Sequence, residues 1–442
     1  HGMRGPWVGT RRINGDAVPT ISAFLSAEDE WSPKPLQANA GKSFIGSYVL
    51  GMGFTMSPEE AQAHIARDAH NAEVLFPYLN GEDLNSHPQQ LASRWVINFW
   101  DWPLDRSAED GTWASADEGQ RELWMRDGRV PADYPGRVAA DFPELLGIVE
   151  KYVKPERQRR DDEGNFALRS PLPQRWWHYA DKRPALYHTI GRGVSFARHP
   201  EGCALDSDID RPTRTVLVAV QTSKYLSLTE QSARQVFSHM TIVFAGLAAE
   251  HQASLLTSFH AAWVSKYASS LETRMRYIPT DCFDTFPAPG ESAELGSLAS
   301  QLLTARQQAM FDLGVGFTSL MNRFHSPKCM EDAVRHFREA QVLLDMAVAQ
   351  AYGWYGIELE YGFHAVQSLP ANDCVRFTCS ASVRADVLRR LSTLNRQRYQ
   401  EEQGAAQSFE SAQAALTVPR KRAGRPAAKK SAAPSAQTLL FE

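Results

Sequence analysis

The chain has 442 residues, 43% of them hydrophobic and 22% charged, with a formal net charge of -4 at pH 7. This length is too great for one compact core, so we expect two or three domains. The slightly acidic balance excludes DNA binding through overall charge, so any DNA-binding surface must be local. The chain has no run of about 18 apolar residues, so we expect no membrane span, and without a signal peptide we expect a cytoplasmic location.

The cysteines argue against a disulfide framework or a zinc knuckle. They are an odd number and none of them forms a CxxC pair. We expect reduced packing residues at Cys203, Cys282, Cys329, Cys374 and Cys379.

The first part of the chain is predicted to be a linker. Residues 1–40 contain a short strand, "PWVGTRRI", the hairpin signal Asn14-Gly15 and a proline-rich connection. The opening "HGM" is typical of a tag remnant, and "RGPWVG" resembles the exit of a strand. We therefore expect a fragment of a longer protein.

Residues 41–289 are predicted to form a mixed, β-rich domain. Ser57 and Pro58 favour a helix start, with Glu59 and Glu60 at its positive end. The later segments predict, in order, a buried strand "RWVINFW", a surface insertion at 105–136, an amphipathic helix at 141–157 ended by Pro155, strands in "RTVLVAVQ" and "QVFSHMTIVFAG", and a helix through "SLLTSFHAAWVSKYASSL".

Residues 290–405 are predicted to be helical. Val334, Phe337, Leu344 and Val348 share one face of a long helix, and "ASVRADVLRRLSTLNRQRYQEE" predicts another. Residues 406–442 are rich in Ala, Gln, Ser, Pro and Lys, which favours a disordered basic tail. The fold class is therefore predicted to be α+β: a mixed β-rich domain, then a small helical domain and this tail.

The stretch "LFPYLNGEDLNSHP" at residues 75–88 poses a choice between an acid pair and a turn. A metal-assisted nuclease built on Glu82 and Asp83 would need a third ligand and a lysine, and no such spacing follows. Asn80-Gly81 favours a positive φ, and Asp83 can accept from nearby backbone amides. We interpret the stretch as a turn.

Several segments combine cations with planar side chains, as DNA binding requires. Large aromatic side chains dominate burial, which favours packing over base contacts for the tryptophans there. Solvated helix ends are an equal alternative for the cations around Lys224 and Lys266. The candidates are Arg157, Arg159, Arg160, Arg175, Trp176, Lys224, Tyr225, Lys266, Arg274, Arg276 and Tyr277. His260 lies on an apolar helix face with Phe259 and Trp263, so we expect a core histidine rather than a general base.

The tail adds two weaker motifs. "PRKRAGRPAAKK" resembles an AT-hook with Ala423 in place of its first arginine, which favours a phosphate-binding tail through residues such as Arg422 and Arg425. "QTLLFE" resembles the peptide by which bacterial proteins dock on the replication sliding clamp, through Gln437, Leu440 and Phe441; a frayed end is the alternative.

Stretches distributed over residues 5–405 resemble the post-catalytic half of MmeI-like class I adenine-specific DNA methyltransferases. They include "GKSFIGSYVLGMGFTMSPEEA", "NAEVLFPYLNGEDLNS", "RWVINFWDWP", "RWWHYADKRPALY" and "SFHAAWVSKYASSLETRMRYIPTDCFDTFPAP", in the family's order. The resemblance implies a linker leaving an upstream methyltransferase domain at 1–40, a target-recognition domain at 41–289 and a helical C-terminal domain at 290–405.

No [ND]PP[YF] motif, which would hold a flipped adenine, and no glycine-rich cofactor loop is present. The resemblance therefore implies sequence-specific binding of double-stranded DNA for restriction-modification or phage defence. Methyl transfer from S-adenosyl-L-methionine would belong to a domain absent from this chain, so no catalytic, cofactor or metal residue is assigned. The alternatives are a free-standing specificity subunit acting in trans with a methyltransferase partner, and a metal-dependent nuclease using Glu82, Asp83 and Asp141.

Overall fold

The structure is a computed structural model that describes residues 11–13, 16–18, 31–191, 214–271, 274–366 and 369–417. Side chains are described for 31–191, 214–268, 275–366 and 369–405. The chain divides into two units, His1–Tyr399 and Gln400–Glu442. The described part of the second unit is the C-terminal stretch of one long helix, and everything below concerns the first unit unless stated.

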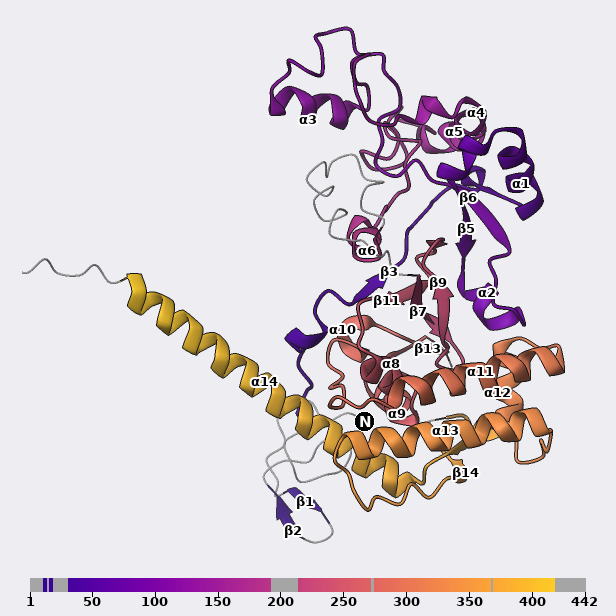
Figure 1. Cartoon of the computed structure of the whole chain (residues 1–442), viewed down its shortest axis with the longest axis vertical. Coiled ribbons are helices and arrows are strands. Elements are labelled where there is room, and N and C mark those ends of the chain that lie inside the picture. Colours follow the sequence, from indigo (N-terminus) through magenta and orange to yellow (C-terminus); the bar gives the residue numbers. More distant parts are fainter. Residues whose placement is uncertain are drawn as a thin grey trace, which may run out of the picture. The chain divides into compact units, whose positions relative to one another are not determined.

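Two four-stranded sheets and a set of helices make up the first unit, which confirms the α+β class (Figure 1). The upper sheet has the order β10-β5-β6-β4 and the central sheet the order β3-β11-β7-β9. Their strands are β10 (Val236–Phe237), β5 (Leu75–Leu79), β6 (Arg94–Ile97), β4 (Thr55–Met56), β3 (Ser43–Ile45), β11 (Thr241–Phe244), β7 (Thr215–Val220) and β9 (Leu228–Ser232).

The central sheet lies between two hydrophobic cores. Successive side chains of a strand point to opposite faces. Val218 of β7 and Val243 of β11 belong to the core shared with the upper sheet, whereas Leu217 and Ile242 belong to the core shared with the helices. Burial on both faces explains why "TVLVAV" is apolar throughout rather than alternating.

The upper core is covered by short helices. Its helices are α1 (Pro58–Arg67), α2 (Gly81–Ser86), α4 (Pro143–Tyr152), α5 (Lys154–Arg157) and α6 (Pro184–Thr189). The predicted helix at 141–157 is thus two helices, because α4 ends at Tyr152 and Pro155 lies within α5. The predicted insertion at 105–136 contains α3 (Glu118–Asp127) and a small core around Trp124 and Tyr134.

The lower core is helical and continues across residue 290. It joins α8 (Ala249–Leu255), α9 (Ser258–Tyr267), α10 (Pro279–Cys282), α11 (Leu295–Leu313), α12 (Phe317–Phe324), α13 (Asp332–Ala351) and the start of α14 (Ala381–Thr417). Because Phe244 and Leu344 belong to the same core, the recognition and helical regions predicted from sequence are packed together. In the second unit, α14 continues to Thr417, past the tail boundary predicted at 405, through an Ala- and Gln-rich stretch compatible with a helix.

Three smaller sheets complete the fold. β1 (Arg11–Ile13) pairs with β2 (Asp16–Val18) as the hairpin signal predicted, with Ile13 opposite Asp16. β12 (Ser269–Leu271), β13 (Arg274–Arg276) and β8 (Thr222–Ser223) form a three-stranded antiparallel sheet. β14 (Gly362–Ala365) and β15 (Val375–Thr378) form a hairpin whose connection contains the short helix η6 (Ala371–Asp373).

None of the helices in the described ranges combines the length and apolar composition needed to cross a bilayer. Four cysteines, Cys282, Cys329, Cys374 and Cys379, are free thiols, as predicted. Cys203 lies outside the described residues.

The start of α1 is confirmed in detail. The Ser57 side chain accepts from the Glu60 backbone N–H at 3.2 Å, and the Glu60 carboxylate accepts from the Ser57 N–H at 2.8 Å. This reciprocal pair satisfies two amides that the first helical turn leaves without partners.

Replacing Ser57 by alanine is expected to lower the free energy of unfolding by about 1 kcal/mol, because it removes the cap. Urea denaturation measures the change. Ser300→Ala, at an exposed position inside α11, is the matched control and should be neutral within about 0.5 kcal/mol. Equal effects of the two substitutions would contradict the capping account.

Candidate nucleic-acid interface

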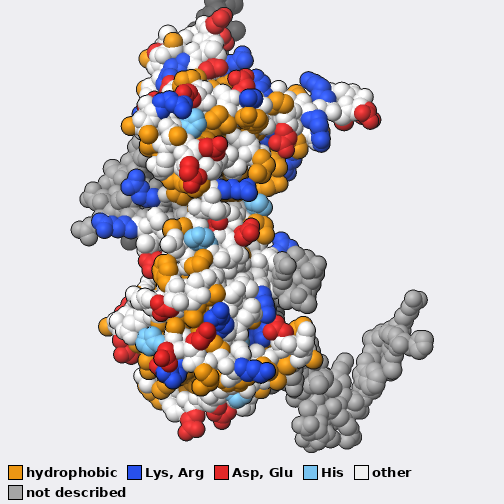
Figure 2. Space-filling view, turned by 90° about the vertical axis from the view of Figure 1, so that its right-hand side faces the viewer, with side chains coloured by type: hydrophobic (Ala, Val, Ile, Leu, Met, Phe, Trp, Pro, Cys, Tyr) orange, Lys and Arg blue, Asp and Glu red, His pale blue; other side chains and the backbone are white. Residues whose placement is uncertain are grey.

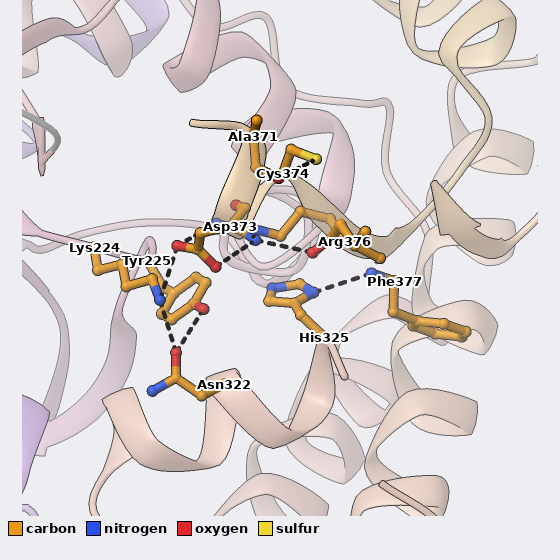
Figure 3. Close-up of polar contacts among 10 residues, drawn as sticks. Lys224, Tyr225, Asn322, His325, Ala371, Asp373, Cys374, Arg376 and Phe377 are labelled. Atoms are coloured by element: carbon orange, nitrogen blue, oxygen red, sulfur yellow. Dashed lines mark hydrogen bonds and ion pairs between the residues drawn. The ribbon is translucent and has the colours of Figure 1, made fainter. Parts of the chain in front are cut away.

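The predicted DNA-binding residues Lys224 and Tyr225 lie in the turn between β8 and β9. Tyr225 is 7% exposed and belongs to the lower core, and its hydroxyl donates to Asn322 Oδ1 of α12 at 2.8 Å. Lys224 remains at the surface, where its Nζ donates to the same oxygen at 2.9 Å (Figure 3). The buried ring therefore fixes the turn and holds the ammonium group at the surface.

The carboxylate of Asp373, in the β14–β15 hairpin, forms an ion pair with this ammonium group. Asp373 Oδ2 lies 2.9 Å from Lys224 Nζ, and Arg376 NH1 donates to Asp373 Oδ1 at 3.2 Å (Figure 3). The Arg376 guanidinium also lies 5.2 Å from the centre of the Tyr225 ring. We refer to Lys224, Tyr225, Asn322, Asp373 and Arg376 as the Lys224 cluster.

The charges within the Lys224 cluster stabilise one another. Burial would raise the pKa of the Asp373 carboxyl, but hydrogen bonds from Lys224 and Arg376 outweigh it and lower that pKa. Burial likewise opposes the charge of Lys224, yet the bonds to Asp373 and Tyr225 raise its pKa. Both groups are therefore charged at neutral pH.

His325 lies beside the Lys224 cluster as a neutral acceptor. Its Nδ1 accepts from the Phe377 backbone N–H at 3.1 Å (Figure 3), so that nitrogen carries no proton. Burial, followed by the nearby charges of Arg376 and Arg338, lowers the pKa of His325 to about 3. The side chain fixes β15 against α12 and cannot supply a proton at neutral pH.

Three further predicted cations belong to the neighbouring three-stranded sheet and the helix that leads into it. β13 pairs with β8 so that Arg276 is opposite Thr222, two residues before Lys224. The Arg276 side chain is exposed, and Lys266 lies at the end of α9 with its ammonium 5.1 Å from the Tyr267 ring. Arg274 lies in the same strand as Arg276. The fold thus gathers cations that are about fifty residues apart in sequence.

Tyr277, which follows Arg276, points into the core. It is fully buried, and its hydroxyl lies 3.1 Å from His260 Nε2. Burial lowers the pKa of His260 to about 3, which confirms the expected core histidine. Because Tyr277 has no exposed surface here, we leave it out of the proposed DNA contacts.

Arg157 is also buried rather than at the surface. It is 1% exposed and donates to the carbonyl oxygens of Val49 and Leu50 at 3.0 and 2.6 Å. Leu50 has a φ of 48°, so these bonds hold a loop in a conformation that residues with side chains rarely adopt. Burial lowers the pKa of Arg157 to about 10, and the side chain acts as a structural brace.

The other cations of that segment have structural contacts of their own. Arg160 donates to the Gly164 carbonyl and lies 4.4 Å from the Phe166 ring. Arg175 donates to the Arg126 carbonyl at 2.5 Å. Trp176 is 4% exposed and packs in the upper core, which is the packing role considered for it above. The Arg159 side chain is exposed.

The tail candidates Arg422, Arg425, Gln437, Leu440 and Phe441 lie outside the described residues, and their roles stay predictions.

The acid pair of the stretch "NGEDLNS" has a structural explanation. Asn80 caps α2 by accepting from the backbone amides of Glu82 and Asp83, and Asp83 accepts in return from Asn80 and from Ser93. The expected bonds from backbone amides to Asp83 are confirmed, but the turn interpretation is wrong. Gly81–Ser86 is the short helix α2, and its N-cap Asn80 has a φ of -122° rather than a positive one. Gly81 is needed because a Cβ there would lie 2.9 Å from the Val220 side chain.

Asp141, the third acid of the nuclease alternative, also has a partner in the structure. Asp141 forms an ion pair with Arg106, which lowers the pKa of the Asp141 carboxyl against the opposing effect of burial. Within the described ranges, no three His, Cys, Asp or Glu side chains lie close enough together to hold a metal ion.

Single-sequence reasoning missed Asn322, His325, Asp373 and Arg376. They lie about a hundred residues or more after Lys224, on elements that meet it only through tertiary packing. No local spacing signals such a contact. The face in Figure 2 shows acidic and basic side chains intermixed.

No family model matches the chain, and no curated protein matches it. Among solved structures, it is similar to the type IIL restriction-modification enzyme MmeI in complex with DNA, at 15% identity and a TM-score of 0.44. The likeness covers 78% of this chain and 37% of the MmeI chain, so this chain spans little more than a third of that enzyme.

Proposed function

We propose that this chain binds duplex DNA sequence-selectively, as the recognition portion of an adenine-N6 DNA methyltransferase of a restriction-modification or phage-defence system. The observation that carries the proposal is the ordered set of family-like stretches over residues 5–405. Methyl transfer and the binding of S-adenosyl-L-methionine are assigned to a catalytic domain whose motifs this sequence does not contain. This chain would hold the duplex while that domain flips and methylates one adenine.

The cations around β8 and β13 support the proposal. Arg276 lies in β13, and Lys224 follows the neighbouring strand β8. Lys266 lies in the last turn of α9, the helix that leads into the same sheet. Lysine and arginine on such a surface bind phosphates, and an arginine fork also reads guanine. We assign Arg276 as a DNA contact because its side chain is exposed.

The test is equilibrium binding to a random-sequence 30-base-pair duplex, with the affinity measured at several salt concentrations. We expect the affinity to fall by about tenfold or more between 50 and 200 mM salt. Arg276→Gln should weaken binding and reduce the slope of log affinity against log salt by about 1. Absence of binding, or binding that ignores salt, would contradict the proposal.

A matched control distinguishes the loss of a specific DNA contact at Arg276 from the general effect of removing one positive charge. Arg335 on α13 is exposed and paired with Asp332, so Arg335→Gln makes the same charge change away from β13. It should leave the salt slope unchanged. If both substitutions reduce the slope equally, Arg276 has no specific role.

A further inference from the structure

The Lys224 cluster contains two cations directed at one carboxylate. Asp373 accepts from Lys224 Nζ at 2.9 Å and from Arg376 NH1 at 3.2 Å. Among the described residues no second carboxylate is bonded to either cation. Without the Asp373 carboxylate, an ammonium and a guanidinium would converge on one empty position.

That position has the chemistry of a phosphate site. A non-bridging phosphate oxygen accepts from lysine and arginine as a carboxylate oxygen does, and the planar arginine fork suits both anions. Asn322 lies beside the two charged groups, and its Oδ1 accepts hydrogen bonds from Lys224 Nζ and from the Tyr225 hydroxyl (Figure 3). Lys224 is thus held by Asn322 as well as by Asp373. The Arg376 guanidinium also donates to the backbone carbonyls of Asp373 and Val375, each at 2.8 Å, and lies 5.2 Å from the centre of the Tyr225 ring.

Asp373 forms one exposed ion pair, with Lys224, and a second with Arg376, whose side chain is 11% exposed. The side chains of Lys224 and Asp373 are 36% and 40% exposed, and exposed ion pairs contribute little stability. Asp373 also lies at the end of η6, in the connection of a two-stranded hairpin rather than in the core. Its carboxylate can therefore be displaced without unpacking either core.

We propose that the Lys224 cluster is a phosphate-binding site for the DNA backbone, and that Asp373 occupies it in the free chain as an internal substitute for phosphate. DNA would displace the Asp373 carboxylate and bind Lys224 and Arg376. Arg276 is opposite Thr222, two residues before Lys224, on the neighbouring strand. This inference rests on the proposed function, since the phosphate is that of the bound duplex.

Asp373→Asn tests the inference, because it removes the competing charge and retains the shape of the side chain. The affinity for a random-sequence duplex at 100 mM salt is expected to rise about two- to fivefold, the range that an exposed ion pair covers. Lys224→Gln should weaken binding and lower the salt slope by about 1. In the Lys224→Gln background the gain from Asp373→Asn should shrink, because the two residues act on one site.

Asp332→Asn is the matched control, since Asp332 is an exposed, ion-paired aspartate on α13, outside the cluster. It changes the net charge equally and should raise affinity much less. Equal gains from Asp332→Asn and Asp373→Asn, or no gain from Asp373→Asn, would overturn the inference and leave the proposed function standing. Failure of the unaltered chain to bind any duplex would overturn both.

Thermal unfolding of each variant checks that the fold is intact. Asp373→Asn is expected to shift the melting temperature by no more than a few degrees, because the Asp373 side chain is 40% exposed and lies in a hairpin connection outside both cores. If this variant unfolds, Asp373→Ser is the second test, with the same expected rise in affinity and the same contradicting result.

Discussion

At pH 5 the free energy of unfolding is expected to be about 4 kcal/mol lower than at pH 7, through groups that burial keeps neutral. Three histidines are responsible. Burial lowers the pKa of His251 to about 4 and those of His260 and His325 to about 3. In the unfolded chain each has a pKa of about 6.5.

Stability falls with pH here because the unfolded chain binds more protons than the folded chain. Between pH 6.5 and about 4 the unfolded chain binds protons at these three histidines that the folded chain does not bind, so stability is lost as the pH falls. Asp345 has the opposite effect. Burial raises its pKa to about 6, so the folded chain binds the extra proton and this residue alone would favour folding at lower pH. One carboxyl does not offset three imidazoles.

Urea denaturation at pH 5 and pH 7 measures the difference directly. His260→Gln should reduce the pH-dependent loss by about 2 kcal/mol, the share of one buried imidazole at pH 5. Equal stability at the two pH values would show that these side chains are not buried in neutral form.

Replacing Asn395 by alanine is expected to cost about 3 kcal/mol, because a fully buried amide would lose all its bonds at once. Asn395 Oδ1 accepts from the Trp31 indole N–H at 2.8 Å and from the Lys34 amide at 3.0 Å. Its Nδ2 donates to the carbonyls of Lys34 and Thr285 at 2.8 and 2.7 Å. This one side chain joins α14 to segments more than a hundred residues away.

The change is measured by chemical denaturation, with Thr393→Ala on the same helix as the control. Thr393 is exposed and bonds only within its own helix, so the control should cost no more than about 0.5 kcal/mol. Asn395→Asp should also destabilise, since a carboxylate has no donor for the two carbonyls. A neutral Asn395→Ala would contradict the bonded network.

Features fixed by neighbouring residues could be predicted from the sequence. The cap at Ser57, the strand β6 with its buried Val96 and Ile97, and the core position of His260 depend on local spacing, and the structure has all three. The predicted strand "QVFSHMTIVFAG" became β10 and β11, which belong to different sheets, because the turn through Ser238 divides it.

Features that depend on packing between distant segments could not be predicted. The sequence of β7 does not reveal that Leu217 and Val218 belong to different hydrophobic cores. It therefore did not show that the core of Leu217 also contains helices beyond residue 290, and two separate domains were predicted there. Arg157 lies in a basic segment typical of phosphate contacts, but its side chain is buried and bonds to the loop at Leu50. Lys224 was predicted, but Asp373 and Arg376 meet it only once α12 and the hairpin are folded.

The central claim, sequence-selective binding of duplex DNA, is tested most directly by selection from a library of duplexes with a randomised centre. The chain is incubated with the library at 150 mM salt, and the bound fraction is sequenced over successive rounds. We predict that one short motif is enriched, and that Arg276→Gln weakens its enrichment. Bound duplexes that remain random in sequence, or no bound fraction at all, would contradict the account.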